Sequence, residues 1–65
     1  MPLLRIELWA GKSKELKDAI ARDITDVMVK HLNCPPEGVT IVFDERSKAD
    51  WFTAGKSHED LHKDK

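Results

Sequence analysis

The sequence has only one cysteine, Cys34, in 65 residues, so it cannot form a disulfide framework. It has no excess of either charge, because 11 basic and 12 acidic residues leave a net charge of −1. A chain without surplus basic residues cannot neutralise nucleic-acid phosphates. Long apolar runs are lacking, which excludes a membrane span, and no signal-peptide pattern is found. These absences predict a cytoplasmic protein that binds neither nucleic acid nor membranes.

The chain is short enough for a single domain, which we expect to comprise residues 1–65. A domain of about 60 residues buries only about 60% of the surface of its unfolded chain and is marginally stable alone. Small domains without disulfides or a structural metal commonly gain stability by association. The size of the chain therefore predicts contacts between subunits.

The apolar pattern predicts a strand, a long helix and a second strand. Residues 3–9 and 39–44 alternate with a period of two, which is typical of strands. Residues 13–32 carry apolar side chains at helical spacing, with Ser13 as the N-cap and Asn33 as a stop signal. Two strands joined by a helix of this length form a β-α-β unit, in which the strands are parallel.

One helix can cover only one face of such a sheet, so we expect Leu3, Trp9 and Val42 on an open face. Two strands do not form an independently stable sheet, which is a second argument for association. Beyond Trp51 the chain becomes charged, and residues 56–65 are expected to be a frayed tail that the protein does not need.

Three short motifs suggest other chemistry, and each is incomplete. Residues 58–62 match H-E-x-x-H, a zinc-binding pattern, but no third ligand follows, so we expect neither a metal nor another cofactor. Gly11 and Gly55 each precede Lys-Ser but lack the earlier glycine of a phosphate-binding loop. Cys34 has His31 nearby but no third group to orient the pair.

Pro2 is the most informative single residue. An initiator methionine is generally removed before a small residue such as proline, which would leave a secondary amine at the start of the first strand. Proline is also tolerated at strand starts for structural reasons alone. The order of the surrounding features favours the chemical interpretation.

That order resembles the 4-oxalocrotonate tautomerase family over about residues 2–55. It comprises Met-Pro, a strand, a Gly-Lys-Ser turn at Lys12 that opens a helix, a second strand, and an aromatic residue, Trp51, followed by Gly55. The resemblance implies an α/β subunit, a single β-α-β unit with two parallel strands and one long helix, completed by oligomerisation into a four-stranded sheet.

The resemblance also implies site residues and an activity. Pro2 matches the family's catalytic proline, which acts as general acid and base. Lys12 lies where many members have a substrate-binding arginine, Trp51 matches the aromatic wall of the active site, and Thr40 replaces a second arginine and is expected to line the pocket. The implied reaction is keto–enol tautomerisation of a small 2-oxo acid or its dienol, without a cofactor, in a homo-oligomer that is a dimer or a hexamer of three dimers.

Two alternatives stay open. A related enzyme of the same superfamily could dehalogenate, hydrate or decarboxylate a three-carbon acid, although such enzymes usually need a second arginine and a carboxylate base. The chain could instead be a non-catalytic oligomerising module. If Met1 is retained, the nitrogen of Pro2 is an amide and cannot act as a base.

Overall fold

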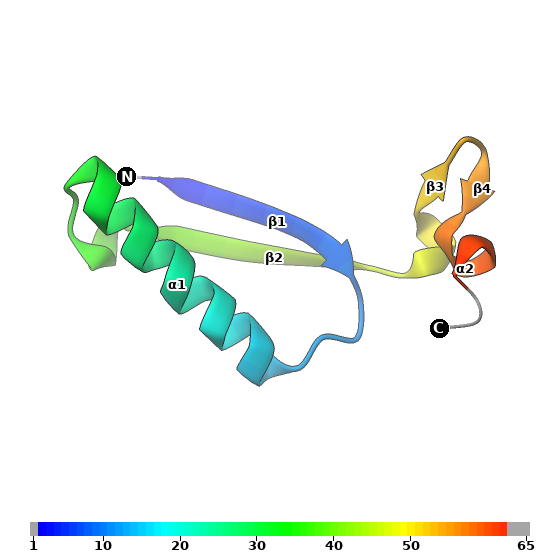
Figure 1. The fold of residues 1–65 in the computed structure, drawn as a ribbon, viewed down its shortest axis with the longest axis horizontal. Coiled ribbons are helices and arrows are strands. Elements are labelled where there is room, and N and C mark those ends of the chain that lie inside the picture. Colours follow the sequence, from blue (N-terminus) through cyan, green and yellow to red (C-terminus); the bar gives the residue numbers. More distant parts are fainter. Residues whose placement is uncertain (1, 63–65) are drawn as a thin grey trace.

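The computed structural model describes residues 2–62, so the predictions about Met1 and about residues 63–65 of the tail lie outside the described residues. Figure 1 shows a helix running along a pair of strands, with a small C-terminal segment beyond the strand ends that lie farthest from Pro2. The elements, in chain order, are β1 (Leu3–Trp9), α1 (Lys14–Leu32), the 3-10 turn η1 (Pro36–Gly38), β2 (Thr40–Arg46), a second 3-10 turn η2 (Lys48–Asp50), β3 (Phe52–Thr53), β4 (Lys56–Ser57) and α2 (His58–Leu61).

β1 and β2 are parallel neighbours, with Leu3 opposite Thr40 and Trp9 opposite Arg46, which confirms the predicted β-α-β unit. β2 begins one residue later than predicted and continues past the predicted end at Asp44 to Arg46. The polar end of β2 stays in the ladder because backbone pairing with β1 does not depend on side-chain polarity. The carbonyl of Arg46 even accepts a further hydrogen bond from the backbone N–H beyond β1, at 2.8 Å.

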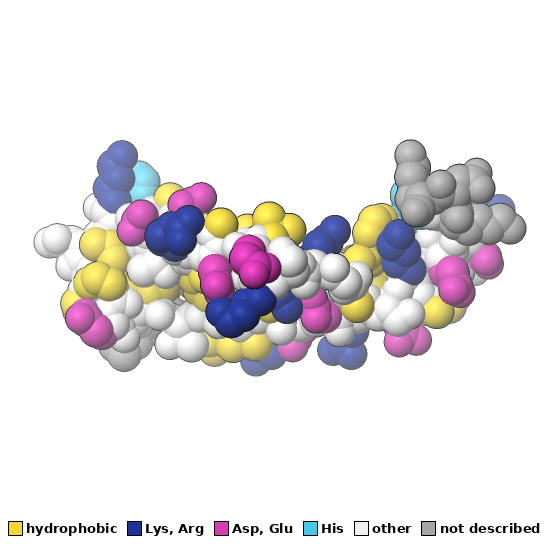
Figure 2. Space-filling view, turned by 90° about the horizontal axis from the view of Figure 1, so that it is seen from below, with side chains coloured by type: hydrophobic (Ala, Val, Ile, Leu, Met, Phe, Trp, Pro, Cys, Tyr) yellow, Lys and Arg dark blue, Asp and Glu magenta, His cyan; other side chains and the backbone are white. Residues whose placement is uncertain are grey.

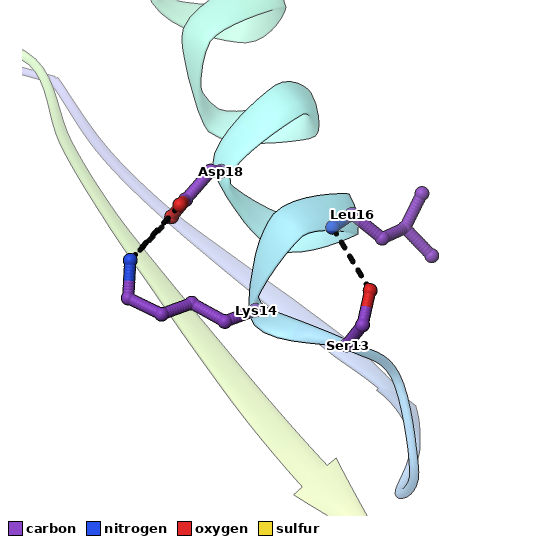
Figure 3. Close-up of polar contacts among 4 residues, drawn as sticks. All are labelled: Ser13, Lys14, Leu16 and Asp18. Carbon is purple, nitrogen blue, oxygen red and sulfur yellow. Dashed lines mark hydrogen bonds and ion pairs between the residues drawn. The ribbon is translucent and has the colours of Figure 1, made fainter.

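α1 begins and ends where the capping residues predict. The hydroxyl of Ser13 accepts the Leu16 N–H at 3.1 Å, and Lys14 pairs with Asp18 at 2.9 Å across one helical turn (Figure 3). An N-cap of this kind stabilises a helix by about 1 kcal/mol, and an exposed pair adds about 0.3–0.5 kcal/mol. At the other end Asn33 takes the left-handed conformation, with φ of 55°, and its N–H bonds back to the last turn.

The ion pair between Lys17 of α1 and Glu45 of β2, at 3.1 Å, shows which face of the sheet the helix covers. Alternation along paired strands puts five apolar side chains on the same face as Glu45: Leu4, Ile6, Leu8, Ile41 and Phe43. The opposite face carries a second ion pair, between Arg5 and Asp44 at 3.0 Å. This open face holds Leu3, which is 60% exposed, as predicted.

The C-terminal segment is folded, in contrast to the frayed tail that the sequence predicts. Ala54 and Gly55 both have positive φ, 56° and 80°, which are the angles of a two-residue hairpin turn between β3 and β4. Ser57 then ends the hairpin and caps α2, accepting the Asp60 N–H at 3.2 Å. Because α2 packs against η2, residues 56–62 belong to the fold.

The described chain has no enclosed hydrophobic core, since none of its hydrophobic residues is fully buried. It is extended, measuring 43 × 24 × 14 Å, and Figure 2 shows hydrophobic side chains reaching the surface between charged ones. Phe52 is 63% exposed and Leu32 is 55% exposed. Such a chain leaves apolar area open that a second subunit can cover. Within residues 2–62, no helix is both long and apolar enough to cross a bilayer.

Candidate active site

Pro2 and Thr40 lie together at the start of the two strands. The N–H of Thr40 donates to the carbonyl oxygen of Pro2 at 3.0 Å, so the parallel ladder begins at this pair. Pro2 is half-buried and Thr40 is exposed. The hydrogen bond uses the carbonyl of Pro2 and does not involve its ring nitrogen. The structure therefore brings these two predicted site residues into contact.

Lys12 and Trp51 lie beyond the opposite ends of the strands. Lys12 is exposed in the turn between β1 and α1, next to Gly11, whose φ of 106° requires a glycine-like backbone. Trp51 follows η2 and is half-buried. A strand rises about 3.3 Å per residue, so β1 separates Pro2 from this region by about 20 Å. One chain by itself does not unite the four predicted residues.

A pocket of about 350 Å³ lies at this second end, formed between the open face of the sheet and the C-terminal segment. Its lining consists of Glu7, Arg46, Asp50, Trp51 and Phe52. Trp51 thus lines a pocket, and its role in an active site stays a prediction. Sequence reasoning did not identify the other lining residues as part of a pocket. Alternation along the predicted first strand could have placed Glu7 on the open face, whereas Arg46 lies beyond the predicted end of the second strand.

The positively charged side chains differ in whether they already form an ion pair with a carboxylate. Arg5 of β1 is paired with Asp44 at 3.0 Å. Among residues 2–62, neither Lys12 nor Arg46 forms an ion pair. Both therefore keep a positive charge available for a carboxylate, and only Arg46 lies in the pocket with Trp51.

Trp51 is held from behind by α2. Its carbonyl oxygen accepts the backbone N–H of His58 at 2.7 Å, and the two rings lie 5.4 Å apart. The indole Nε1 of Trp51 is buried, and within residues 2–62 no acceptor lies in hydrogen-bond range of it. The position of the pocket wall therefore depends on packing and backbone contacts rather than on a side-chain hydrogen bond.

His58 and His62, the histidines of the H-E-x-x-H match, pack against aromatic rings. The indole Nε1 of Trp9 donates to His58 Nδ1 at 3.0 Å, and Thr53 Oγ1 lies 2.8 Å from His58 Nε2. Trp9 is consequently half-buried, whereas the sequence predicts that it is exposed on the open face. The His-x-x-x-His spacing was present in the sequence, but nothing local indicated that these rings reach the end of β1.

Comparison with known proteins places these features in a family. The sequence profile of the Tautomerase family, described as tautomerase enzyme, matches residues 2–61. A probable tautomerase of Ralstonia nicotianae is 36% identical over 56 residues, which cover 86% of each chain. A probable tautomerase of Listeria innocua is 31% identical over 61 residues, which cover 94% of this chain and all of the relative.

Solved structures agree with the sequence match. A 4-oxalocrotonate tautomerase isozyme from Methylibium petroleiphilum superimposes with a TM-score of 0.87 at 28% identity, over 94% of this chain and 98% of its own. A heterohexamer 4-oxalocrotonate tautomerase from Chloroflexus aurantiacus gives a TM-score of 0.86 at 29% identity, over 95% and 100% of the two chains. The chain therefore belongs to the tautomerase family and has the fold of the 4-oxalocrotonate tautomerases.

Proposed function

We propose that the protein is a cofactor-independent isomerase that interconverts the enol and keto forms of a small 2-oxo acid or its dienol. Pro2, after removal of Met1, is the general acid and base. The observation that carries the proposal is that the family match begins at residue 2, and Pro2 directly precedes β1.

The chemistry requires a base that is neutral near physiological pH. A free α-amino group titrates near about 7.7–8.0, and partial burial or a nearby cation lowers the pKa of an amine because both disfavour its charged form. In one direction the neutral nitrogen of Pro2 takes the proton of the enol hydroxyl, and the resulting ammonium gives it to a carbon of the enol or dienol as the C–O bond becomes a carbonyl. In the reverse direction Pro2 takes a proton from that carbon and returns it to the oxygen, so the double bonds move and no other group is consumed.

Binding of the substrate carboxylate falls to Lys12, with Trp51 as the wall that excludes water. An ammonium donor beside the developing enolate stabilises the negative charge of the transition state. Thr40, whose backbone is already tied to Pro2, lines the site next to the base. Lys12 offers a point charge rather than the planar fork of an arginine, and Thr40 stands where the resemblance implies a second arginine, so the site has less to hold a dicarboxylate substrate.

The complete site requires more than one subunit. Pro2 and Thr40 lie about 20 Å along β1 from the region of Lys12 and Trp51, so a neighbouring chain must supply one of the two groups. The exposed apolar residues and the lack of an enclosed core in residues 2–62 support such an assembly. The Chloroflexus relative is a heterohexamer. We propose a homo-oligomer for this chain, as a dimer or as a hexamer of three dimers.

The pH dependence of the rate tests the role of Pro2. Intact mass first establishes that Met1 is absent from the purified protein. With phenylenolpyruvate or a 2-hydroxydienoate as substrate, kcat/KM should rise with pH through the titration of the amine, because only the neutral amine accepts a proton. Pro2→Ala replaces the secondary amine by a less basic primary amine, so its profile should shift toward lower pH. An unshifted profile would contradict the proposal.

A further inference from the structure

We propose that His58 is a positioning residue that fastens the Trp51 wall to the end of β1, and that protonation of its ring releases this contact as the pH falls. The role of Trp51 in catalysis rests on the proposed function. The contact itself and its response to pH do not rest on that function. They follow from the geometry of four side chains, those of Trp9, Trp51, Thr53 and His58.

His58 holds the pocket wall through two kinds of contact. Its backbone N–H donates to the carbonyl oxygen of Trp51 at 2.7 Å. Its ring packs on the indole of Trp51 with the centroids 5.4 Å apart and the planes tilted by 40°. Displacement of His58 therefore moves the residue that lines the pocket.

The same ring is tied to two other elements. Trp9, the last residue of β1, donates its indole N–H to His58 Nδ1 at 3.0 Å, and the two rings meet edge to face at 5.5 Å. The hydroxyl of Thr53, in β3, lies 2.8 Å from His58 Nε2. One imidazole thus joins the sheet, the hairpin and the wall of the pocket.

The hydrogen bonds of the His58 ring require it to be neutral. An indole Nε1 can only donate, so His58 Nδ1 must be the unprotonated nitrogen that accepts from Trp9. The proton of the neutral ring is then on Nε2, where it can donate to the hydroxyl of Thr53. Protonation of Nδ1 places two donors against each other, which breaks the bond between the ring and β1.

The charged surroundings do not compensate a positive His58. Within residues 2–62, no carboxylate forms an ion pair with this ring, and the ammonium of Lys48 lies 4.5 Å from the ring of Trp9. The ring of His62 lies 5.6 Å from that of His58 and 5.0 Å from that of Trp9. The other charged groups on the packed elements and the adjoining strand ends are Asp50 of η2, Lys56 of β4, Glu59 and Asp60 of α2, Glu7 of β1 and Arg46 of β2.

The two hydrogen bonds of the ring set the direction of the pH effect. While the ring is neutral, His58 Nδ1 accepts from Trp9 and the wall is fixed. Acid that protonates Nδ1 removes the bond to Trp9, and Trp51 then loses its support.

Tryptophan fluorescence provides a test without turnover, because the only two tryptophans of the chain, Trp9 and Trp51, both contact His58. Because the ring of His62 also lies 5.0 Å from that of Trp9, the reference protein carries His62→Asn. Its emission should change as the pH is lowered. Adding His58→Asn keeps an acceptor near the position of Nδ1 but removes the ionisable ring, so this change should disappear. Adding His31→Asn instead, on the exposed end of α1, is the matched control and should leave the change in place. The same change after addition of His58→Asn would overturn the proposal.

Nitrogen-15 NMR of the unmodified protein keeps the test independent of how the variants fold. At about pH 8 the signals of His58 should show a neutral ring with the proton on Nε2, and a proton on Nδ1 would contradict the proposal. In the assay, KM should rise more than kcat falls as the pH decreases, and His58→Asn should remove that rise. If no tautomerase activity is found but the NMR and fluorescence results hold, the proposed function fails and the contact stands.

Discussion

The β-α-β half of the molecule and its C-terminal segment are stabilised in different ways. In the first half, residues 3–46, backbone pairing over seven positions and a long capped helix hold the chain together. In the segment from η2 to α2, the strands are two residues long, and single side chains hold the elements in place. His58 and Ser57 make most of these contacts. Repetitive secondary structure tolerates single changes, whereas the segment that forms the pocket wall depends on a few contacts.

The largest effect is expected from a charge on the open face of the sheet. Leu3→Asp should separate the subunits, because a carboxylate in an apolar interface loses its hydration without gaining a partner. Sedimentation at micromolar concentration measures the change, with Arg22→Glu on the solvated face of α1 as the control that remains assembled. A folded 7 kDa monomer of the unmodified protein would contradict the expected assembly.

Removal of the cation that binds the substrate should have the next largest effect. Lys12→Ala should cost about 1.5–3 kcal/mol in kcat/KM, the range for a hydrogen bond to a charged group. Arg46→Ala is the matched comparison, because this residue lines the pocket with Trp51 and forms no ion pair within residues 2–62. A large loss in Arg46→Ala together with an unaffected Lys12→Ala would assign the carboxylate to Arg46.

Truncation after Lys56 distinguishes the two halves most directly. From the sequence alone, this tail is expected to be dispensable for both fold and activity. The contacts of His58 with Trp9 and Trp51 change the expectation for activity. The β-α-β half and its assembly should persist, but KM should rise. Circular dichroism and sedimentation report on the fold, and steady-state kinetics report on the site. If the truncated and full-length proteins have the same kcat and KM, the segment is dispensable for activity, as the sequence alone predicts.

Substitutions of Trp51 should have graded effects. Trp51→Ala removes the wall of the pocket and should raise KM while the oligomer remains intact. Trp51→Phe keeps an aromatic wall and removes the buried N–H that finds no acceptor among residues 2–62, so it should leave stability unchanged or raise it by up to about 1 kcal/mol. Thermal unfolding measures this difference, and a clear loss of stability in Trp51→Phe would reveal a partner for the N–H.

The sequence predicted the first half of the fold because its signals are local. Period-two alternation identified both strands, and Ser13 and Asn33 gave the ends of the helix. The contact of Pro2 with Thr40 follows from the parallel register that such a unit requires. Two-residue strands have no detectable period, so the hairpin could not be predicted in this way.

The pocket wall was predictable in part. Trp51 stood out because it matches the aromatic residue of the family resemblance, and it lines a pocket together with Phe52. The bond from Trp9 to His58 joins residues 49 positions apart, and no local pattern encodes that distance. The separation of Pro2 from Lys12 likewise became visible only when both were placed along the length of β1.

The central claim is that the nitrogen of Pro2 performs the chemistry, and one comparison tests it most directly. The processed protein and the same chain with Met1 retained, each verified by intact mass, are assayed on phenylenolpyruvate at equal concentration and equal oligomeric state. A retained methionine converts the amine to an amide, which cannot accept a proton, so the Met1-retaining protein should show no turnover above background. Equal turnover by the two proteins would contradict the account, because the N-terminal amine would then not be the catalyst.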